Sequence, residues 1–448
     1  MTLPLPPGPR GYPIVGVLPR IWRDPLRFFE QVGHEHGPVA RVGLGKFTLY
    51  LLTQPAPIQR VLQDNAQNYW KGAGLAAAEP VMGKGLATSE GELWRRQRKL
   101  VQPAFARKRM SELLPAMQAA TEGLIARWAD AARRGEAVEA VADTSALTQE
   151  LIFRCLFGGD LGAAQAELGE ALLEANAYIN AAAWSFFPLP ERVPTPRRVR
   201  FRRALATLDR LVYGLIATRR ARGPSASAPD LLDRLLAASD EGGGMSDRQA
   251  RDEVMTLFVA GHDTTAGALA WTLLLLAQHP EQARRVREEA DAVLGEAPPD
   301  AHDLARLEHT ERVVRESMRV YPPAWVIVRT PFADDELGGY RVPKDAPVLI
   351  SQYVVHRHPD VWPDPLRFDP ERWLPERAES RPRFAYFPYG AGQRLCVGKP
   401  FADAALLLVI ARLLQRFELA LVGAAPRARP LTTLRPGGPL RLRLTPRR

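Results

Sequence analysis

Only one of the two cysteines in this chain of 448 residues has neighbours that suggest chemistry. Cys396 lies in the stretch FPYGAGQRLCVGKPF, beside the three glycines Gly390, Gly392 and Gly398. Glycines permit unusual backbone dihedrals and the close approach of a bulky flat group. Arg394 and the start of the helix predicted just downstream both favour a deprotonated thiol. We therefore expect Cys396 to be a thiolate that acts as a ligand or as a nucleophile.

The nucleophile interpretation requires a histidine nearby as a base, and none of the eight histidines lies close to Cys396 in the sequence. The histidines also lack the spacing of a zinc site, and HEH at 34–36 is typical of an exposed helix end. A single thiolate that serves as the axial ligand of haem iron is the better account. Cys155, within LIFRCLFGG, is expected to be a buried packing residue.

A second group of candidate residues lies in the stretch LFVAGHDTTAGALAWTLLLL, which has the pattern of a long buried helix. Gly261 in a helix interior costs about 1 kcal/mol relative to alanine, so a helix that only packs would avoid it. Asp263 is a candidate to relay protons, and the Thr264 hydroxyl is a candidate to donate to a bound oxygen species. The alternative is a helix crossing with a small-residue contact and a surface aspartate.

Two further motifs bring charged residues together. Glu316 and Arg319, in ESMR, lie on one helix face, and Arg372, in RFDPERW, could complete a three-member network. Trp94 and Arg98, in LWRRQRKL, point the same way on a helix, which suits a carboxylate pair. An exposed basic helix with one packed tryptophan would give the same pattern.

The elements that must position these residues are mostly helices. Apolar residues recur at helical spacing over 104–133, 143–157, 163–183, 200–222, 246–278, 280–294, 303–320 and 400–417. Strand patterns cover 39–53 and 337–355. We predict a mainly helical (α+β) fold with small sheets, in one domain over 1–448, whose β-rich part lies mainly at 35–60 and 325–390.

The composition limits the partners. The net charge is +10, which suits an acidic partner, but the basic residues lack the aromatic interleaving expected for nucleic-acid binding. We therefore do not expect binding to nucleic acid. No uninterrupted apolar stretch reaches the roughly 18 residues of a membrane span. Two cysteines without a disulfide framework suit a reducing compartment, so we expect a cytoplasmic protein.

In combination, these motifs resemble the cytochrome P450 family, the haem-thiolate monooxygenases, in its soluble bacterial form. The resemblance runs through LPLPPGPRGYPIVG, WRRQR, AGHDTT, ESMR, DPERW and FPYGAGQRLCVG, in the family's order. It implies a single helical prism with haem between the long central helix and the helix after the cysteine loop. It also implies haem b as cofactor and O2 as co-substrate.

The resemblance assigns a role to each candidate. Cys396 would be the axial ligand of the haem iron, and Asp263 with Thr264 the proton-delivery pair. The residues that would hold the haem propionates are Trp94, Arg98, Arg329 and Arg394. The structural network would be Glu316, Arg319 and Arg372. The residues that would face the substrate are Ala87, Val259, Ala260, Trp325, Val326 and Ile327.

The sequence departs from the family at two positions. Tyr389 and Trp373 stand where the family usually has phenylalanine, and the Tyr389 hydroxyl could change the polarity near the sulfur. Trp184, Phe186 and Phe187 could line an entry channel or could simply pack in a core or loop.

We expect hydroxylation of a lipophilic small molecule by a monomeric enzyme, with terpenoids first and fatty acids or steroids next. The chain ends without a flavin or iron–sulfur domain, so electrons are expected from an acidic ferredoxin or flavodoxin with its reductase. A haem-thiolate peroxygenase or isomerase is an alternative that needs no electron donor. A haem-based gas sensor is another, and it would bind gas without turnover.

Overall fold

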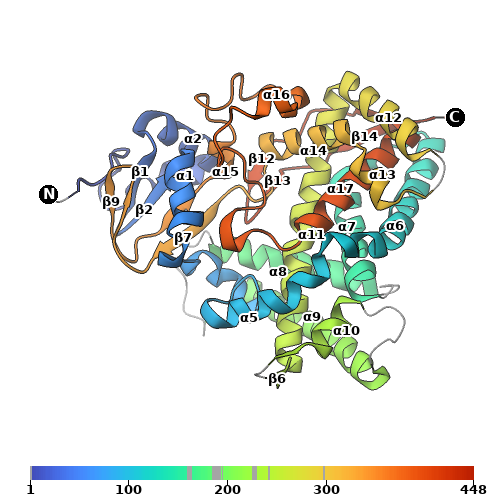
Figure 1. Cartoon of the computed structure of the whole chain (residues 1–448), viewed down its shortest axis with the longest axis horizontal. Helices are drawn as coiled ribbons and strands as arrows, with labels where there is room; N and C mark the ends of the chain where they lie inside the picture. The colour runs from blue at the N-terminus through green and yellow to red at the C-terminus, as the bar shows by residue number, and fades with distance from the viewer. Residues whose placement is uncertain are drawn as a thin grey trace. The chain divides into compact units, whose positions relative to one another are not determined.

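The computed structural model describes residues 3–158, 164–183, 193, 195–223, 230–240, 243–295 and 298–447. Figure 1 shows their helices and strands. These residues form two compact units. Unit 1 comprises 1–74, 312–396 and 428–435, and unit 2 comprises 75–311, 397–427 and 436–448. Helices dominate and the sheets are small, which confirms the predicted fold class.

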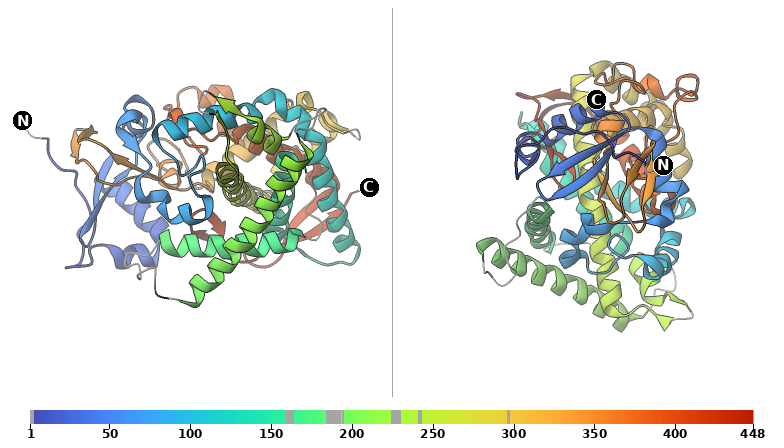
Figure 2. Two further views of the ribbon diagram at one scale, coloured as in Figure 1. Left: turned by 90° about the horizontal axis from the view of Figure 1, so that it is seen from below. Right: turned by 90° about the vertical axis from the view of Figure 1, so that its left-hand side faces the viewer.

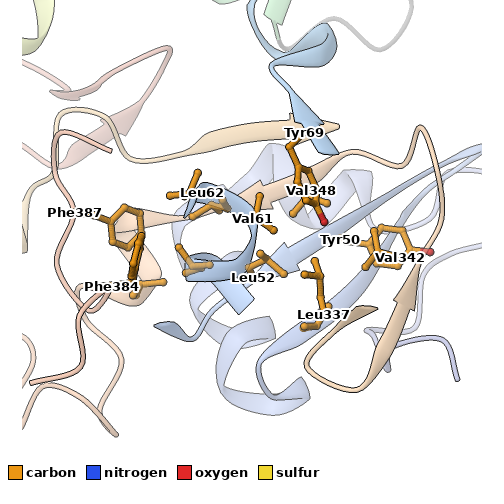
Figure 3. Packing of buried hydrophobic residues seen from close by; sticks show 14 residues of the cluster. Tyr50, Leu52, Val61, Leu62, Tyr69, Leu337, Val342, Val348, Phe384 and Phe387 are labelled. Carbon is orange, nitrogen blue, oxygen red and sulfur yellow. The ribbon is translucent and has the colours of Figure 1, made fainter. Parts of the chain in front are cut away.

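Unit 1 is built around a five-stranded sheet with the order β1-β2-β10-β7-β3. Its strands are β1 (Val39–Leu44), β2 (Phe47–Leu52), β10 (Val348–Ile350), β7 (Ile327–Pro331) and β3 (Tyr69–Trp70). β10 pairs in parallel with β2 and antiparallel with β7. Valine, isoleucine and leucine side chains from these strands pack on Val61, Leu62, Phe384 and Phe387 to form the unit's core (Figure 3). The core thereby connects the sheet with the residues that lead to Cys396.

Short helices and hairpins complete unit 1. The helices are α1 (Leu18–Arg23), α2 (Pro25–His36), α3 (Pro55–Gln59), α15 (Gln352–Val355), α16 (Pro375–Ala378), the π-helix η1 (Arg60–Asp64), and the 3-10 helices η2 (Ala66–Asn68), η5 (Pro370–Trp373) and η6 (Gly392–Arg394). The hairpins are β8 (Asp335–Leu337) with β9 (Tyr340–Val342) and β12 (Ala428–Pro430) with β13 (Leu434–Pro436). His34 and His36 lie at the end of α2, as predicted.

Unit 2 is organised along the helix α11 (Asp247–Gln278), which is buried along most of its length. The Ser246 hydroxyl accepts the backbone N–H of Gln249 and so caps the N-terminus of α11. α11 packs on α7 (Ala140–Phe157), and α8 (Ala164–Ala183) lies beside α9 (Pro196–Arg222) (Figure 2).

The remaining elements of unit 2 surround these helices. The helices are α4 (Glu79–Met82), α5 (Gly91–Val101), η4 (Gln102–Phe105), α6 (Arg107–Arg133), α10 (Leu231–Ala237), α12 (Pro280–Leu294), α13 (Ala301–Ala305) and α17 (Lys399–Arg416). The 3-10 helix η3 (Gly72–Ala78) begins in unit 1 and ends in unit 2. The strands are β4 (Val138–Glu139), β5 (Ser239–Asp240), β6 (Gly243–Gly244), β11 (Phe417–Leu421) and β14 (Arg441–Pro446). α14 (Glu308–Val320) runs from unit 2 into unit 1.

Two predicted elements differ from the structure. The helix expected over 303–320 is two helices, because α13 ends at Ala305 and α14 begins at Glu308. The strand segment expected over 337–355 contains β8, β9 and β10 and ends in the helix α15. Ser351 caps α15 by accepting the N–H of Val354. The strand prediction rested on the alternation of apolar residues and did not consider this capping residue.

Candidate active site

The Cys396 loop, residues 387–396, is a compact turn that backbone hydrogen bonds between its own residues help to close. The Cys396 N–H donates to the Tyr389 carbonyl at 3.0 Å, and the Leu395 N–H donates to the Gly392 carbonyl at 3.1 Å. Gly390 and Gly392 have φ values of +70° and +64°, in the region that favours glycine. The Cys396 side chain is exposed at the end of this turn. The loop therefore presents an accessible thiol at the end of a hydrogen-bonded turn.

Gly392 is also required for packing. A Cβ atom at this position would overlap the carbonyl oxygen of Leu62 in η1. The loop thus rests directly on the backbone of a π-helix, a conformation often found near functional sites. Gly398, by contrast, has an ordinary φ of −81° at the N-cap of α17, so it does not use the dihedral freedom that Gly390 and Gly392 use.

A buried carboxylate holds η1 in place. Asp335 accepts hydrogen bonds from Arg60 at 2.6 Å, from the Tyr69 hydroxyl at 2.7 Å and from Asn65 at 3.1 Å. Burial raises the pKa of Asp335, but these hydrogen bonds outweigh it and the pKa lies below its usual value. A charged Asp335 thus fixes the helix on which the Cys396 loop rests.

The structure brings Glu316, Arg319 and Arg372 together in a fully buried network. Arg319 binds both carboxylate oxygens of Glu316 at 2.9 Å, and Arg372 Nε lies 3.3 Å from Glu316 Oε1. Trp373, one of the two departures from the family, donates its indole N–H to Glu316 Oε2 at 3.1 Å. The tryptophan therefore adds a fourth member to the network that phenylalanine could not supply. The sequence motif gave no signal of this fourth contact.

The other cysteine lies in a contrasting environment. Cys155, on α7, is 3% exposed, and its sulfur lies 3.8 Å from the Leu113 carbonyl oxygen. Burial raises the pKa of its thiol to about 12. This confirms the predicted packing role and leaves Cys396 as the thiol suited to metal ligation.

The Cys396 loop fits an iron porphyrin by the chemistry of its donor. An axial ligand must be an accessible, deprotonated sulfur, and the flat macrocycle requires a backbone with small side chains beside it. The exposed Cys396 side chain and the glycines of the turn meet the requirements of access and space, and Arg394 on η6 places a positive charge two residues from Cys396 in the chain.

The buried part of α11 is interrupted by one stretch that is accessible to solvent. Ala260 is exposed and Gly261 and Thr264 are half-buried, whereas the helix on both sides of this stretch is buried. The Thr264 hydroxyl donates to the Ala260 carbonyl at 2.8 Å. Asp263, the neighbour of Thr264, is only 7% exposed. This open segment of α11, residues 260–264, thus presents a hydroxyl beside a buried carboxyl.

Gly261 also lies where α11 crosses α7, which is the small-residue helix contact considered as the alternative in the sequence analysis. A Cβ atom there would lie 3.1 Å from Ile152 Cδ1 on α7. On the buried face of the same segment, His262 Nε2 lies 2.8 Å from the Ser145 hydroxyl of α7. Gly261 therefore allows α7 to pack closely while the other side of the segment stays open.

The loop that carries Ala87 is attached to α11 by carboxylates. The Lys84 N–H donates to Asp252 at 2.9 Å, and the Leu86 N–H donates to Glu253 at 3.0 Å. Both carboxylates lie on α11 less than three turns before its open segment. The sequence analysis missed this attachment, because acidic residues such as Asp252 and Glu253 are common near the start of a helix. Ala87 itself is half-buried.

The residues expected to bind the propionates lie on three elements. Trp94 and Arg98 lie on α5, where Trp94 is buried and Arg98 Nε donates to Gln102 at 3.0 Å. In unit 1, Arg329 lies on β7 and donates to the Val328 carbonyl at 2.8 Å, and Arg394 lies on η6.

The residues expected to face the substrate differ in exposure. Val259 is buried beside the exposed Ala260. Val326 and Ile327 are half-buried, but Trp325 is 1% exposed and donates its indole N–H to the Leu431 carbonyl at 2.8 Å. Trp325 therefore packs inside unit 1, and its place facing the substrate stays a prediction. Trp184, Phe186 and Phe187 lie outside the described residues.

Among the described residues, no helix is long and apolar enough to cross a membrane. The family profile described as Cytochrome P450 matches residues 6–439. Cyclooctatin synthase from Streptomyces melanosporofaciens is 38% identical, covering 98% of this chain and 95% of that protein. Cyclooctat-9-en-7-ol 5-monooxygenase from the same organism is 36% identical, covering 92% and 88%.

Pentalenene oxygenase from Streptomyces avermitilis is 34% identical, covering 98% of this chain and 97% of that protein. Among solved structures, the cytochrome P450DA heme domain matches with a TM-score of 0.89 and 26% identity, covering 100% of this chain and 99% of that one. The resemblance seen in the motifs is thus confirmed along the whole chain. The protein belongs to the cytochrome P450 family, the haem-thiolate monooxygenases.

Proposed function

We propose that this cytochrome P450 hydroxylates a terpenoid with electrons from a separate ferredoxin. The observation that best supports this is the open segment of α11, where an accessible hydroxyl lies beside apolar residues. Such a surface can hold a lipophilic molecule and deliver protons next to it.

We assign the cofactor to haem b, whose iron Cys396 would bind through its thiolate. Trp94, Arg98, Arg329 and Arg394 would bind its propionates through N–H donors, since guanidinium and carboxylate groups form strong charge-assisted hydrogen bonds. When bound, the haem iron would supply the oxygen-activating chemistry, in which one oxygen atom of O2 enters the substrate and the other leaves as water. The internal hydrogen bonds of the Cys396 loop would keep the sulfur in place.

Thr264 and Asp263 would deliver the protons. The Thr264 hydroxyl hydrogen is directed to the Ala260 carbonyl, so its oxygen can accept a hydrogen bond from a water molecule on the accessible side. When the hydroxyl rotates away from Ala260, it becomes a donor on that side. The buried Asp263 carboxyl is the adjacent group that can replace the proton. A peroxygenase or isomerase would not need this pair.

The terpenoid class is supported by the relatives. Their names specify pentalenene, an unsaturated hydrocarbon, and cyclooctat-9-en-7-ol, an unsaturated alcohol. Val259 and Ala260 on α11, with Ala87, offer small apolar side chains that could leave room for a bulky ring system. Fatty acids and steroids are the competing classes.

The net charge of the chain supports our choice of electron donor. With a net charge of +10, the surface attracts acidic proteins, and steering of this kind speeds association at low ionic strength. An acidic ferredoxin with its reductase is the donor that we propose, and a flavodoxin is the competing one. We further propose that the chain works as a monomeric, single-domain enzyme in the cytoplasm.

The test is a reconstituted reaction with NADPH, a ferredoxin reductase, and either a ferredoxin or a flavodoxin under 18O2. Pentalenene, cyclooctat-9-en-7-ol, dodecanoic acid and a steroid are supplied separately. We expect a product that gains one 18O atom from a terpenoid, at a rate that falls with added salt. Conversion of the fatty acid or steroid alone would overturn the proposed substrate class, and turnover with peroxide but with neither donor would overturn the electron route.

A further inference from the structure

His356 is a buried imidazole for which the site described above has no role. It follows directly after α15, is 0% exposed, and lies in unit 1 with the Cys396 loop. Its ring packs edge-on against the Phe387 ring, with centroids 5.2 Å apart, and lies tilted against the Tyr386 ring, with centroids 5.1 Å apart. A polar ring buried this completely requires a hydrogen-bonding partner.

The partner is the first residue of the Cys396 loop. The Phe387 N–H donates to His356 Nε2 at 3.0 Å. Nε2 must therefore be unprotonated, since a protonated ring nitrogen cannot accept this bond. Burial and the charge of Arg319 lower the pKa of His356 to about 3, although the Met318 carbonyl acts in the opposite sense. The ring is thus neutral and remains an acceptor throughout the physiological range.

The backbone of His356 joins the loop to the buried charge network. Its carbonyl accepts the Arg319 Nη1 at 2.8 Å, and Arg319 is held by both oxygens of Glu316. One residue therefore contacts the network with its carbonyl and the Cys396 loop with its ring. No other side-chain acceptor for the Phe387 N–H occurs among the described residues.

Backbone hydrogen bonds within the loop connect Phe387 with Cys396. The Phe387 carbonyl accepts the Gly390 N–H at 2.9 Å, and the Tyr389 carbonyl accepts the Cys396 N–H at 3.0 Å. Phe387 is itself anchored in the apolar core of unit 1 (Figure 3). We propose that His356 is a positioning residue that fixes the backbone of the Cys396 loop and thereby the orientation of the thiolate towards the haem iron. This inference rests on the proposed ligation of haem by Cys396.

The test compares variants that keep or lose the acceptor. His356→Gln supplies an amide oxygen, whereas His356→Phe keeps a flat ring without an acceptor and His356→Met is close to glutamine in length but only a weak acceptor. His358→Phe is the matched control, because His358 is buried in the same segment and its Nδ1 lies 3.4 Å from a turn amide, that of Asp360, outside the loop. The haem-loaded proteins are compared by the carbon monoxide spectrum of the reduced form and by the reduction potential.

We expect the wild type, His356→Gln and His358→Phe to keep the red-shifted thiolate band. His356→Phe and His356→Met should lose at least half of that band and show a shifted potential. Folded His356→Phe and His356→Met proteins with an unchanged band and potential would overturn the inference, as would an equal loss in His358→Phe. A wild type without the thiolate band would overturn the proposed haem ligation instead.

If neither acceptor-free variant folds, amide hydrogen exchange in the wild type decides. A Phe387 amide held by His356 should exchange as slowly as the buried amides of α14, since both would open only on large-scale unfolding. Exchange of Phe387 at the rate of an exposed loop would overturn the inference.

Discussion

The Cys396 loop and the open segment of α11 each present a reactive group, but the fold holds them by different means. The loop rests on buried polar contacts, which begin at Glu316 and Arg319 and end at the Phe387 N–H. The α11 segment lies in a helix with apolar residues on almost every side. In the loop, therefore, hydrogen bonds define the position of the reactive group, whereas in α11 the helix itself does.

The difference predicts how each region responds to mutation. Buried charges and hydrogen bonds are costly when one partner is lost, because the remaining group stays buried and unpaired. A hydroxyl on a packed helix can be removed with little change in stability. Substitutions around the loop should therefore affect folding and haem ligation together, whereas those in the α11 segment should affect the reaction alone.

The largest effect is expected from Glu316→Gln. The neutral amide would leave Arg319 and Arg372 buried beside it without a full countercharge, so the free energy of unfolding should fall by about 3–5 kcal/mol. Chemical denaturation measures this change. Glu288→Gln is the control, since Glu288 pairs with Arg284 at 2.7 Å on the exposed surface of α12. There the loss should be about 0.5 kcal/mol or less, and equal losses would contradict the comparison.

Trp373→Phe should have the next largest effect. The substitution restores the usual residue of the family but removes the indole bond to Glu316, and bonds to charged groups contribute about 1.5–3 kcal/mol. The matched substitution is Trp362→Phe, because the buried Trp362 donates to the neutral carbonyl of Val355 at 3.1 Å. If the Trp362 variant loses as much stability as the Trp373 variant, the indole bond adds nothing specific to the network.

The pH dependence of stability should identify the buried histidine. Because the folded pKa of His356 is about 3 and the unfolded value is near 6.5, the unfolded state binds one more proton between these values. Stability should therefore fall as the pH drops below about 6.5, by up to about 1.4 kcal/mol per pH unit from this group. Unfolding at pH 7.5 and 5.5 measures the slope. The unfolded imidazole takes up about half a proton on average between these two pH values, so in His356→Gln the slope should be smaller by about half a proton. An unchanged slope would exclude a neutral buried imidazole.

The smallest effect on stability is expected from Thr264→Ala, whose unfolding free energy should change by about 0.5 kcal/mol or less. Its effect on the reaction should be large, since removal of a positioned proton donor typically costs about 100-fold or more. Product formed per NADPH consumed is the measure, with whichever of the four test compounds is converted. Thr265→Ala is the control, because Thr265 is the neighbouring threonine on α11 and is buried, whereas Thr264 is half-buried. Equal coupling in the two variants would remove Thr264 from proton delivery.

Much of this arrangement could be predicted from the sequence. The motifs indicated the family, the solitary reactive cysteine and the Glu316–Arg319 pair, because these depend on local spacing. The contacts of Trp373, His356 and Leu62 could not be predicted, since they join segments far apart in the chain. The burial of Trp325 and its bond to the Leu431 carbonyl could not be predicted either, because an apolar side chain after a proline turn is equally compatible with a pocket wall and with a core.

The central claim is that Cys396, and not Cys155, ligates the haem iron. The most direct measurement is the carbon monoxide difference spectrum of the dithionite-reduced protein, with Cys396→Ala and Cys155→Ala beside the wild type. We predict a red-shifted Soret band in the wild type and in Cys155→Ala, and its complete loss in Cys396→Ala. A band at the position of histidine-ligated haem in the wild type, or a red-shifted band that survives in Cys396→Ala, would contradict the claim.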